Sequence, residues 1–173
     1  MAYTFLRAKK IATGKSLVEA DKIDLAADLL ARSVSKGVAI ELPVDHVVAA
    51  GLDASESQTL PIDRTPDNLM GLDIGPQTVT HYGTILAGAR TIVWNGPMGV
   101  FENPRFAQGT FGIARAVADS KAFSIVGGGD SAAAVAQSGM ESKITHISTG
   151  GGASLEFLSG QKLPGVEALT QKG

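Results

Sequence analysis

Three glycine-rich turns hold the residues of this chain whose types and spacing could do chemistry. The segment 95–102 reads NGPMGVFE, 127–131 reads GGGDS, and 149–154 reads TGGGAS. Glycine lets a backbone approach an anion closely, and the first amides of a following helix have no acceptor within that helix. Turns of this composition between a strand and a helix favour phosphate binding.

Asp130 follows the three glycines of the second turn. One interpretation makes its carboxylate the N-cap of the next helix, a contribution of about 1 kcal/mol to helix stability. The other interpretation makes it a ligand of a magnesium ion, because magnesium binds a few carboxylates together with phosphate oxygens. The residue type alone leaves both interpretations open.

The turn at 149–154 repeats the same design after another expected strand. If both helix starts face one crevice, they supply two separate groups of amide donors for the spread charge of a phosphoryl group. Catalysis in such a site is electrostatic and depends on positioning rather than on a nucleophile.

The first turn, 95–102, contains two glycines and one proline, so we expect its backbone to adopt a defined conformation. Glu102 stands at its far end and can accept hydrogen bonds from ligand hydroxyls, such as those of a ribose. The alternative is a turn with an acid beside the next helix.

Other motif-like features do not lead to a site. The tripeptide GKS at 14–16 looks like the end of a P-loop, but the earlier glycine of that motif falls on Lys9. No GxGxxG fingerprint opens the first βα unit, which disfavours dinucleotide binding. His46, His81 and His146 share no metal-ligand spacing, so we expect each to be packed or solvated.

Alternating strands and helices must position these turns. Hydrophobic residues recur at helical spacing from Ile23 onward, and Gly37 is placed as the terminator. Further helices are expected at 79–86, around Phe106 to Val117, at 131–137 and at 153–158, with strands at 38–42, 90–94, 123–126 and 143–147. The segment 51–68 is polar and contains two prolines, which predicts loops with room for a hairpin.

This alternation predicts the fold class. Strands separated by helices pair in parallel, since only a crossover connection returns the chain for another parallel strand. We therefore expect an α/β protein with a three-layer αβα, Rossmann-like arrangement around a parallel sheet. Ligands of such sheets collect beyond the carboxyl ends of the strands, where the three turns are expected to lie.

Length and composition narrow the function classes. The chain has 173 residues, 44% of them hydrophobic and 18% charged, which predicts one globular core rather than disorder. A net charge of −2 gives the chain no overall positive electrostatic potential that would attract nucleic acid or an anionic membrane. The chain has no cysteine, no apolar run long enough to span a membrane and no signal peptide, so we expect a cytoplasmic protein.

Seven segments carry a family resemblance: MAYTFLRA, LPVDHVVA, MGLDIGP, TIVWNGPMGVFE, VGGGDSAAA, HISTGGGASLEFLSG and LPGVEAL. In order and spacing they resemble phosphoglycerate kinase, and specifically the carboxyl-terminal, nucleotide-binding half of that two-domain enzyme. The resemblance implies transfer of a phosphoryl group between 1,3-bisphosphoglycerate and ADP, or from ATP to 3-phosphoglycerate in reverse, with Mg²⁺. It also implies a six-stranded parallel sheet between helices.

The resemblance assigns roles to residues that match the family's motifs. Those implied to contact the base, sugar and nucleotide crevice are Gly71 and Leu72 (adenine), Glu102 (ribose), and Asn95, Pro97 and Val100. Those implied to bind phosphates are Gly127, Gly129, Ser131, Gly150 and Gly152, with Asp130 as the ligand of the magnesium nucleotide. The backbone amides of Gly128 and Gly151 are implied to act catalytically on the transferring phosphoryl group.

Other parts of the family's site are expected ahead of Met1: the phosphoglycerate-binding domain with its basic patch and catalytic arginine, the GGAK segment with its following lysine, and glycines that line the adenine. Residues 1–173 are therefore expected to be the carboxyl-terminal domain, truncated on its amino side and ending near the family's natural terminus. Arg7, Lys9 and Lys10 receive no catalytic role.

ADP or ATP is accordingly the expected ligand, with 3-phosphoglycerate bound only through the absent domain. We expect neither nucleic acid nor membrane as a partner, self-association through surface left uncovered, and no turnover from these residues alone. The alternative is a freestanding, noncatalytic nucleotide-binding or interaction module. A Rossmann-like oxidoreductase is a third reading, disfavoured by the missing fingerprint.

Overall fold

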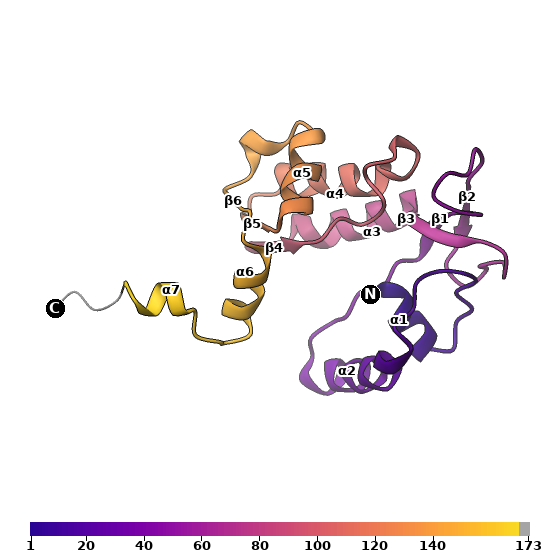
Figure 1. The fold of residues 1–173 in the computed structure, drawn as a ribbon, viewed down its shortest axis with the longest axis horizontal. Coiled ribbons are helices and arrows are strands. Elements are labelled where there is room, and N and C mark those ends of the chain that lie inside the picture. Colours follow the sequence, from indigo (N-terminus) through magenta and orange to yellow (C-terminus); the bar gives the residue numbers. More distant parts are fainter. Residues whose placement is uncertain (170–173) are drawn as a thin grey trace. The chain divides into compact units, whose positions relative to one another are not determined.

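The computed structural model describes residues 1–169 (Figure 1). The chain divides into two compact units. Unit 1 comprises Met1–Tyr82 and Met98–Thr110, and unit 2 comprises Gly83–Pro97 and Phe111–Gly173. Two units thus take the place of the one core expected from the length. The last four residues of the expected domain, 170–173, lie outside the described residues.

Unit 1 begins with two helices, α1 (Ala2–Ala8) and α2 (Ile23–Lys36), the second preceded by a 3-10 turn at Ala20–Lys22. Their buried side chains, Leu6 and Ala26, are 1% and 3% exposed. Gly37 ends α2 in the left-handed conformation with φ 63°, which confirms the predicted terminator.

An antiparallel sheet forms the rest of unit 1. It contains β1 (Asp45–Ala49), β2 (Gln58–Pro61) and β3 (Met70–Ile74) in the order β2-β1-β3. The expectation of parallel strands throughout, and of six in one sheet, is wrong for this unit. Its strands are joined by the loops 50–57 and 62–69, and parallel pairing needs a crossover that these loops do not supply.

The segment 38–42 is not a strand, contrary to expectation. It is apolar but has no strand beside it to complete a ladder, and Val38 is 63% exposed. The strand instead begins after Pro43, in β1, which has a neighbour on each side. The segment 51–68 does not contain the whole hairpin that its sequence allowed: it contains β2, which pairs antiparallel with the preceding strand β1.

Helix α3 (Pro76–Ala87) begins three residues earlier than the hydrophobic pattern predicts. Proline is tolerated in the first turn of a helix because it has no amide hydrogen to satisfy. The buried carboxylate of Asp45 accepts hydrogen bonds from the next two amides, that of Gln77 at 3.0 Å and that of Thr78 at 2.7 Å. A residue from β1 therefore fixes the start of this helix.

Unit 2 is built around a parallel sheet of β4 (Thr91–Asn95), β5 (Phe123–Gly127) and β6 (His146–Ser148) in that order. Helices α4 (Gln108–Asp119) and α5 (Gly129–Gln137) lie beside these strands, and α6 (Gly151–Leu158) and α7 (Pro164–Glu167) follow (Figure 1). The predicted α/β class, with a parallel sheet flanked by helices, is confirmed.

Several element boundaries in unit 2 differ from the predicted ones. Helices α5 and α6 begin at Gly129 and Gly151, two residues before the predicted starts, so each helix includes glycine that the sequence pattern assigned to the preceding turn. The strand expected at 143–147 is shorter, since a 3-10 turn occupies Glu141–Lys143. Phe106 belongs to another 3-10 turn, Pro104–Phe106, rather than to α4. Within residues 1–169, no helix is both long and apolar enough to cross a bilayer.

Candidate functional site

The three strands of unit 2 end side by side. Asn95, the last residue of β4, pairs with Gly127 of β5, and Gly127 pairs with Ser148 of β6. The turns that follow these residues therefore start from one edge of the sheet. This is the edge at which parallel α/β sheets bind ligands.

The turn after β5 uses glycine to change direction. Gly128 has φ 100°, a conformation that favours glycine, and it is the N-cap residue of α5. The interpretation of Asp130 as the N-cap is therefore wrong. Asp130 lies in the first turn of α5 with an exposed side chain. Among the described residues, its carboxylate has no hydrogen bond or ion pair, so it is available to a ligand.

The two glycine turns meet. A Cβ atom placed on Gly151 would lie 2.7 Å from the Cα atom of Gly128, a distance that only glycine avoids. A Cβ atom on Gly127 would lie 3.6 Å from the side chain of Ser154. The arrangement required by the sequence hypothesis, with the starts of α5 and α6 close together, is present.

Three of the expected amide donors already have acceptors in this structure, and one of them is Gly150, whose amide donates to Ser148 Oγ at 3.3 Å. The Gly128 amide donates to the carbonyl oxygen of Ser148 at 2.9 Å, and the Gly151 amide donates to that of Thr149 at 3.1 Å. The first amides of a helix have no acceptor within it. The donors at the two helix starts are therefore the amides of Gly129, Asp130, Ser131, Gly152 and Ala153.

The side-chain amide of Asn95 stands against the place where the turns meet. Its Nδ2 atom would lie 3.4 Å from a Cβ atom on Gly127 or Gly151, and 3.8 Å from one on Gly128. Three glycines thus leave room beside one amide group. An N–H donor of this kind adds to the backbone donors for an anion.

Gly96 is held at both of its polar atoms. Its amide donates to the hydroxyl of Ser131 at 2.7 Å, and its carbonyl oxygen accepts from the indole of Trp94 at 2.6 Å. Ser131 is 1% exposed. The hydroxyl implied to contact phosphate therefore also links the turn after β4 to the start of α5.

Replacing Ser131 with alanine should destabilise the protein. The Gly96 amide then loses its acceptor, at a cost of about 1–3 kcal/mol in the free energy of unfolding. Urea denaturation of the wild type, Ser131→Ala and Ser131→Thr measures this cost, with threonine keeping the hydroxyl. Equal midpoints for alanine and wild type would contradict the role given to this hydrogen bond.

In unit 1, the structure brings Leu72 and Val100 together. The Val100 amide donates to the carbonyl oxygen of Leu72 at 2.9 Å, and Val100 packs against a buried cluster of Ala49, Leu72 and Phe106. Gly71 has no room for a side chain, because the Tyr3 hydroxyl occupies that space, and its amide donates to Ser16 Oγ at 2.9 Å.

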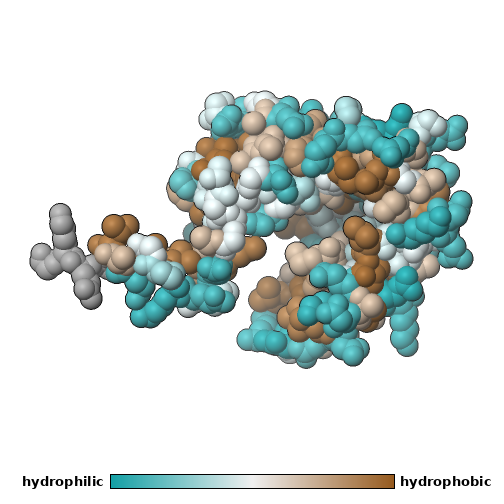
Figure 2. All heavy atoms as spheres, in the orientation of Figure 1, coloured by the Kyte–Doolittle hydropathy of each residue, from teal (hydrophilic) through white to brown (hydrophobic). Residues whose placement is uncertain are grey.

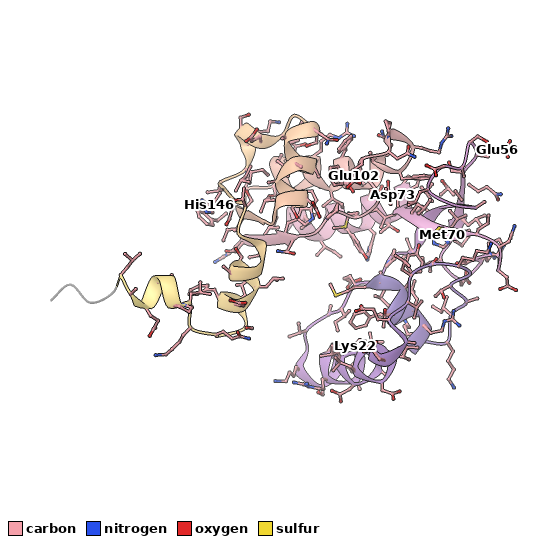
Figure 3. All side chains as sticks on the ribbon, viewed as in Figure 1. Lys22, Glu56, Met70, Asp73, Glu102 and His146 are labelled. Carbon is pink, nitrogen blue, oxygen red and sulfur yellow. The ribbon has the colours of Figure 1, made fainter. Side chains whose placement is uncertain are left out.

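Glu102 is exposed, and its carboxylate has no hydrogen bond or ion pair within residues 1–169, so it too is free to accept (Figure 3). Among the predicted site residues, unit 1 contains Gly71, Leu72, Val100 and Glu102. Unit 2 contains Asn95, Pro97 and the two glycine turns. The predicted nucleoside contacts thus lie in unit 1, and the predicted phosphate contacts lie in unit 2.

The histidines behave as expected. His46 is 1% exposed and bonds Tyr3 Oη at 2.8 Å and Thr65 Oγ1 at 3.3 Å, so it is packed. His81 pairs with Glu41 at 2.9 Å, and His146 is exposed on β6. Within the described part of the chain, no group of three or more metal-ligating side chains is present. A magnesium ion carried by phosphates needs fewer, and the exposed Asp130 carboxylate beside free amides fits that need.

Asp73 in β3 is a buried acid that sequence reasoning did not select. It is 4% exposed, and burial raises its pKa to about 7 despite hydrogen bonds from the amides of Gly109 and Ile74. The motif MGLDIGP contains it, but nothing in the local pattern separates a buried aspartate from an exposed one. Burial of Asp73 has a consequence for stability.

An acid whose pKa is higher in the folded protein holds more protons folded than unfolded between the two values. The free energy of unfolding should therefore fall as pH rises from 3.8 to about 7 because of Asp73. Burial lowers the pKa of His46, which acts in the opposite direction as pH rises toward 6.5. The test compares wild type with Asp73→Asn across this range. Parallel pH profiles would contradict the raised pKa.

Sequence comparison gives a match over most of the chain. A profile of the phosphoglycerate kinase family matches residues 1–161. The phosphoglycerate kinase of Anaeromyxobacter dehalogenans strain 2CP-C is 54% identical over 172 residues, 99% of this chain and 43% of that protein. The phosphoglycerate kinase of Koribacter versatilis is 58% identical over 180 residues, with coverage of 99% and 43%.

Solved structures of phosphoglycerate kinases also match this chain. The phosphoglycerate kinase of Coxiella burnetii superposes with a TM-score of 0.92 at 45% identity, over 98% of this chain and 44% of that one. The enzyme of Pyrococcus horikoshii OT3 gives a TM-score of 0.84 at 38% identity, over 97% and 42%. The chain thus spans less than half the length of the relatives that it matches.

Proposed function

Because the chain belongs to the phosphoglycerate kinase family, we propose that it is the carboxyl-terminal, nucleotide-binding domain of such a kinase. Its function would be to hold ADP or ATP, with Mg²⁺, while a phosphoryl group passes between the nucleotide and phosphoglycerate. The observation that carries this proposal is the meeting of the two glycine turns at the carboxyl edge of a parallel sheet. Cytoplasmic localisation belongs to the same proposal.

The phosphate end of the nucleotide is assigned to unit 2. The amides at the starts of α5 and α6, among them those of Gly129 and Gly152, would bind the phosphates. Gly127 ends β5 and Gly150 precedes α6, and both are proposed to line the same phosphate position. Backbone amides aimed at a site of developing negative charge stabilise it without having to reorganise. Magnesium, when bound with the nucleotide, neutralises phosphate charge, and Asp130 is placed to hold it.

Gly128 and Gly151 are proposed to act on the transferring phosphoryl group through their amides. Each amide would first have to release its present acceptor, the carbonyl oxygen of Ser148 or Thr149. A small rotation of the two turns is therefore part of the proposal. Glycine at both positions permits such a rotation, because it has no Cβ atom to restrict the backbone.

The nucleoside end is assigned by family resemblance. Gly71 and Leu72 would form part of the adenine pocket, and the Glu102 carboxylate would accept hydrogen bonds from the ribose. Asn95, Pro97 and Val100 would line the nucleotide crevice. The free carboxylate of Glu102 supports this assignment, because an acceptor without a protein donor is available to ligand hydroxyls.

Calorimetric titration and a turnover assay test the proposal together. The 173-residue chain should bind Mg-ADP more weakly than a full-length relative does. Titration with NAD⁺ should give no more heat than titration of NAD⁺ into buffer. The chain should show no turnover in either direction, because holding donor and acceptor in line supplies about 7–11 kcal/mol of the barrier. Preference for NAD⁺ would instead revive an oxidoreductase. Binding as tight as that of a full-length kinase, without turnover, would favour a freestanding module.

Self-association is a further expectation for the isolated chain. Large hydrophobic side chains are exposed in both units, among them Val34 at 82% and Phe157 at 65%, and Figure 2 shows hydrophobic surface over α2 and along α6 and α7. Sedimentation velocity should detect oligomers that Val34→Ser and Phe157→Ser reduce. A monomer at every concentration, with cooperative unfolding, would contradict this expectation.

A further inference from the structure

A buried polar cluster in unit 1 contacts the loop 98–102. It consists of Asp73 from β3, Thr110 from α4, and the glycines Gly99 and Gly109. Asp73 is 4% exposed, and Thr110 is fully buried at 0%. Burying a carboxylate and a hydroxyl costs free energy unless they are hydrogen-bonded, so their partners indicate what they do.

Thr110 binds the loop directly. Its Oγ1 atom accepts the amides of Met98 and Gly99, each at 3.1 Å. The next amide, that of Val100, donates to the Leu72 carbonyl oxygen at 2.9 Å. Three consecutive amides are thus fixed by two elements, α4 and β3, and the chain then continues through Phe101 to Glu102.

Asp73 fixes the helix that carries Thr110. Its Oδ2 atom accepts the Gly109 amide in the first turn of α4 at 2.7 Å, and its Oδ1 atom accepts the amide of Ile74 at 2.9 Å. A carboxylate near a helix N-terminus interacts favourably with the exposed amides there. Asp73 therefore places the first turn of α4 against β3.

The glycines close the cluster. A Cβ atom on Gly99 would lie 2.6 Å from the Leu72 carbonyl oxygen and 2.7 Å from the Asp73 Cα atom. A Cβ atom on Gly109 would lie 2.5 Å from the side chain of Ile74. The loop and the start of the helix therefore both contact β3 more closely than any residue with a side chain permits.

We propose that Asp73 and Thr110 are positioning residues that fix the loop 98–102 and thereby set the location of Glu102 for the sugar of a bound nucleotide. This rests on the proposed nucleotide-binding function. Figure 3 labels Asp73 on β3 and Glu102 on the loop. The two side chains have no hydrogen bond to each other. Asp73 acts through Gly109 and Thr110, and Thr110 acts through the loop amides.

The test uses the 173-residue chain with Thr110→Val, which keeps the shape of threonine but removes the acceptor, and with Thr110→Ser, which keeps the hydroxyl. Hydrogen exchange at the Met98 and Gly99 amides reports whether the loop is held. Calorimetry with Mg-ADP and with magnesium pyrophosphate, which has no sugar, separates a loop effect from an effect on the phosphate site.

Thr110→Val should accelerate hydrogen exchange at both amides. It should also weaken Mg-ADP binding about tenfold, which corresponds to the net free energy of about one hydrogen bond. Pyrophosphate affinity should stay within about twofold of wild type. Thr110→Ser should return both the amide exchange rates and the Mg-ADP affinity to wild-type values. If Thr110→Val does not fold, Asp73→Asn is measured in the same way, with exchange at Gly109 added.

Unchanged exchange, or faster exchange with unchanged Mg-ADP affinity, would overturn the positioning role. Equal losses for ADP and pyrophosphate would also overturn it, because they would indicate a general structural defect. A wild-type chain that binds neither ligand would show that the proposed function itself has failed, and this inference with it.

Discussion

Asp45→Ala is expected to lower the free energy of unfolding by about 3–5 kcal/mol, a large share of the roughly 5–15 kcal/mol that stabilises a typical domain. Asp45 is 1% exposed, and its carboxylate accepts the amides of Gln77 and Thr78 and the hydroxyl of Thr78 at 2.6 Å. Alanine removes this acceptor from all three donors, and the amide and hydroxyl of Thr78 are buried. The start of α3 would then lose its attachment to β1.

The measurement is urea denaturation followed by circular dichroism. Asp53→Ala serves as the control, because Asp53 is an exposed aspartate and its loss should change the free energy of unfolding by less than about 0.5 kcal/mol. Asp45→Asn should lie between the two, since an amide oxygen replaces one of the two acceptor oxygens. If Asp45→Ala and Asp53→Ala unfolded at the same urea concentration, the account of α3 would be wrong.

Asp130→Ala is expected to weaken Mg-ADP binding by about tenfold to hundredfold, which corresponds to a charge-assisted contact of about 1.5–3 kcal/mol. Without magnesium, the same substitution should leave ADP affinity unchanged or raise it. A carboxylate beside bare phosphates repels them, whereas a magnesium ion turns the carboxylate into a ligand.

Titration of the wild type and of Asp130→Ala with ADP, each in magnesium and in EDTA, gives the four affinities of a thermodynamic cycle. Asp119→Ala is the matched control, because Asp119 is also exposed in unit 2 but pairs with Lys143 at 3.3 Å. Equal losses with and without magnesium would leave Asp130 with a role that does not involve the metal.

The sequence predicted unit 2 far better than unit 1, and the difference has a physical cause. In unit 2, β4, β5 and α4 carry the hydrophobic periods of a parallel sheet and its helices, and glycines mark the turns between them. Local pattern and tertiary packing agree there. The proximity of Gly128 and Gly151 followed from the topology alone, because adjacent parallel strands end at one edge.

Unit 1 was harder because its structure depends on long-range contacts. The antiparallel ladder of β1 with β2 and β3 is set by side chains that meet across the sheet, and an apolar segment such as 38–42 carries the same local signal as a strand. Asp45 and Asp73 look like ordinary acids in the sequence. Only the fold shows that both are buried and that each fixes the start of a helix.

The most direct test of the central claim follows backbone amide signals by NMR while Mg-ADP is added. The amides of Gly129, Asp130, Ser131, Gly152 and Ala153 should shift together and saturate at one ligand concentration, since they are the donors proposed to hold the phosphates. Saturable binding that shifted other amides and left these five unchanged would contradict the claim that the two glycine turns form the nucleotide phosphate site.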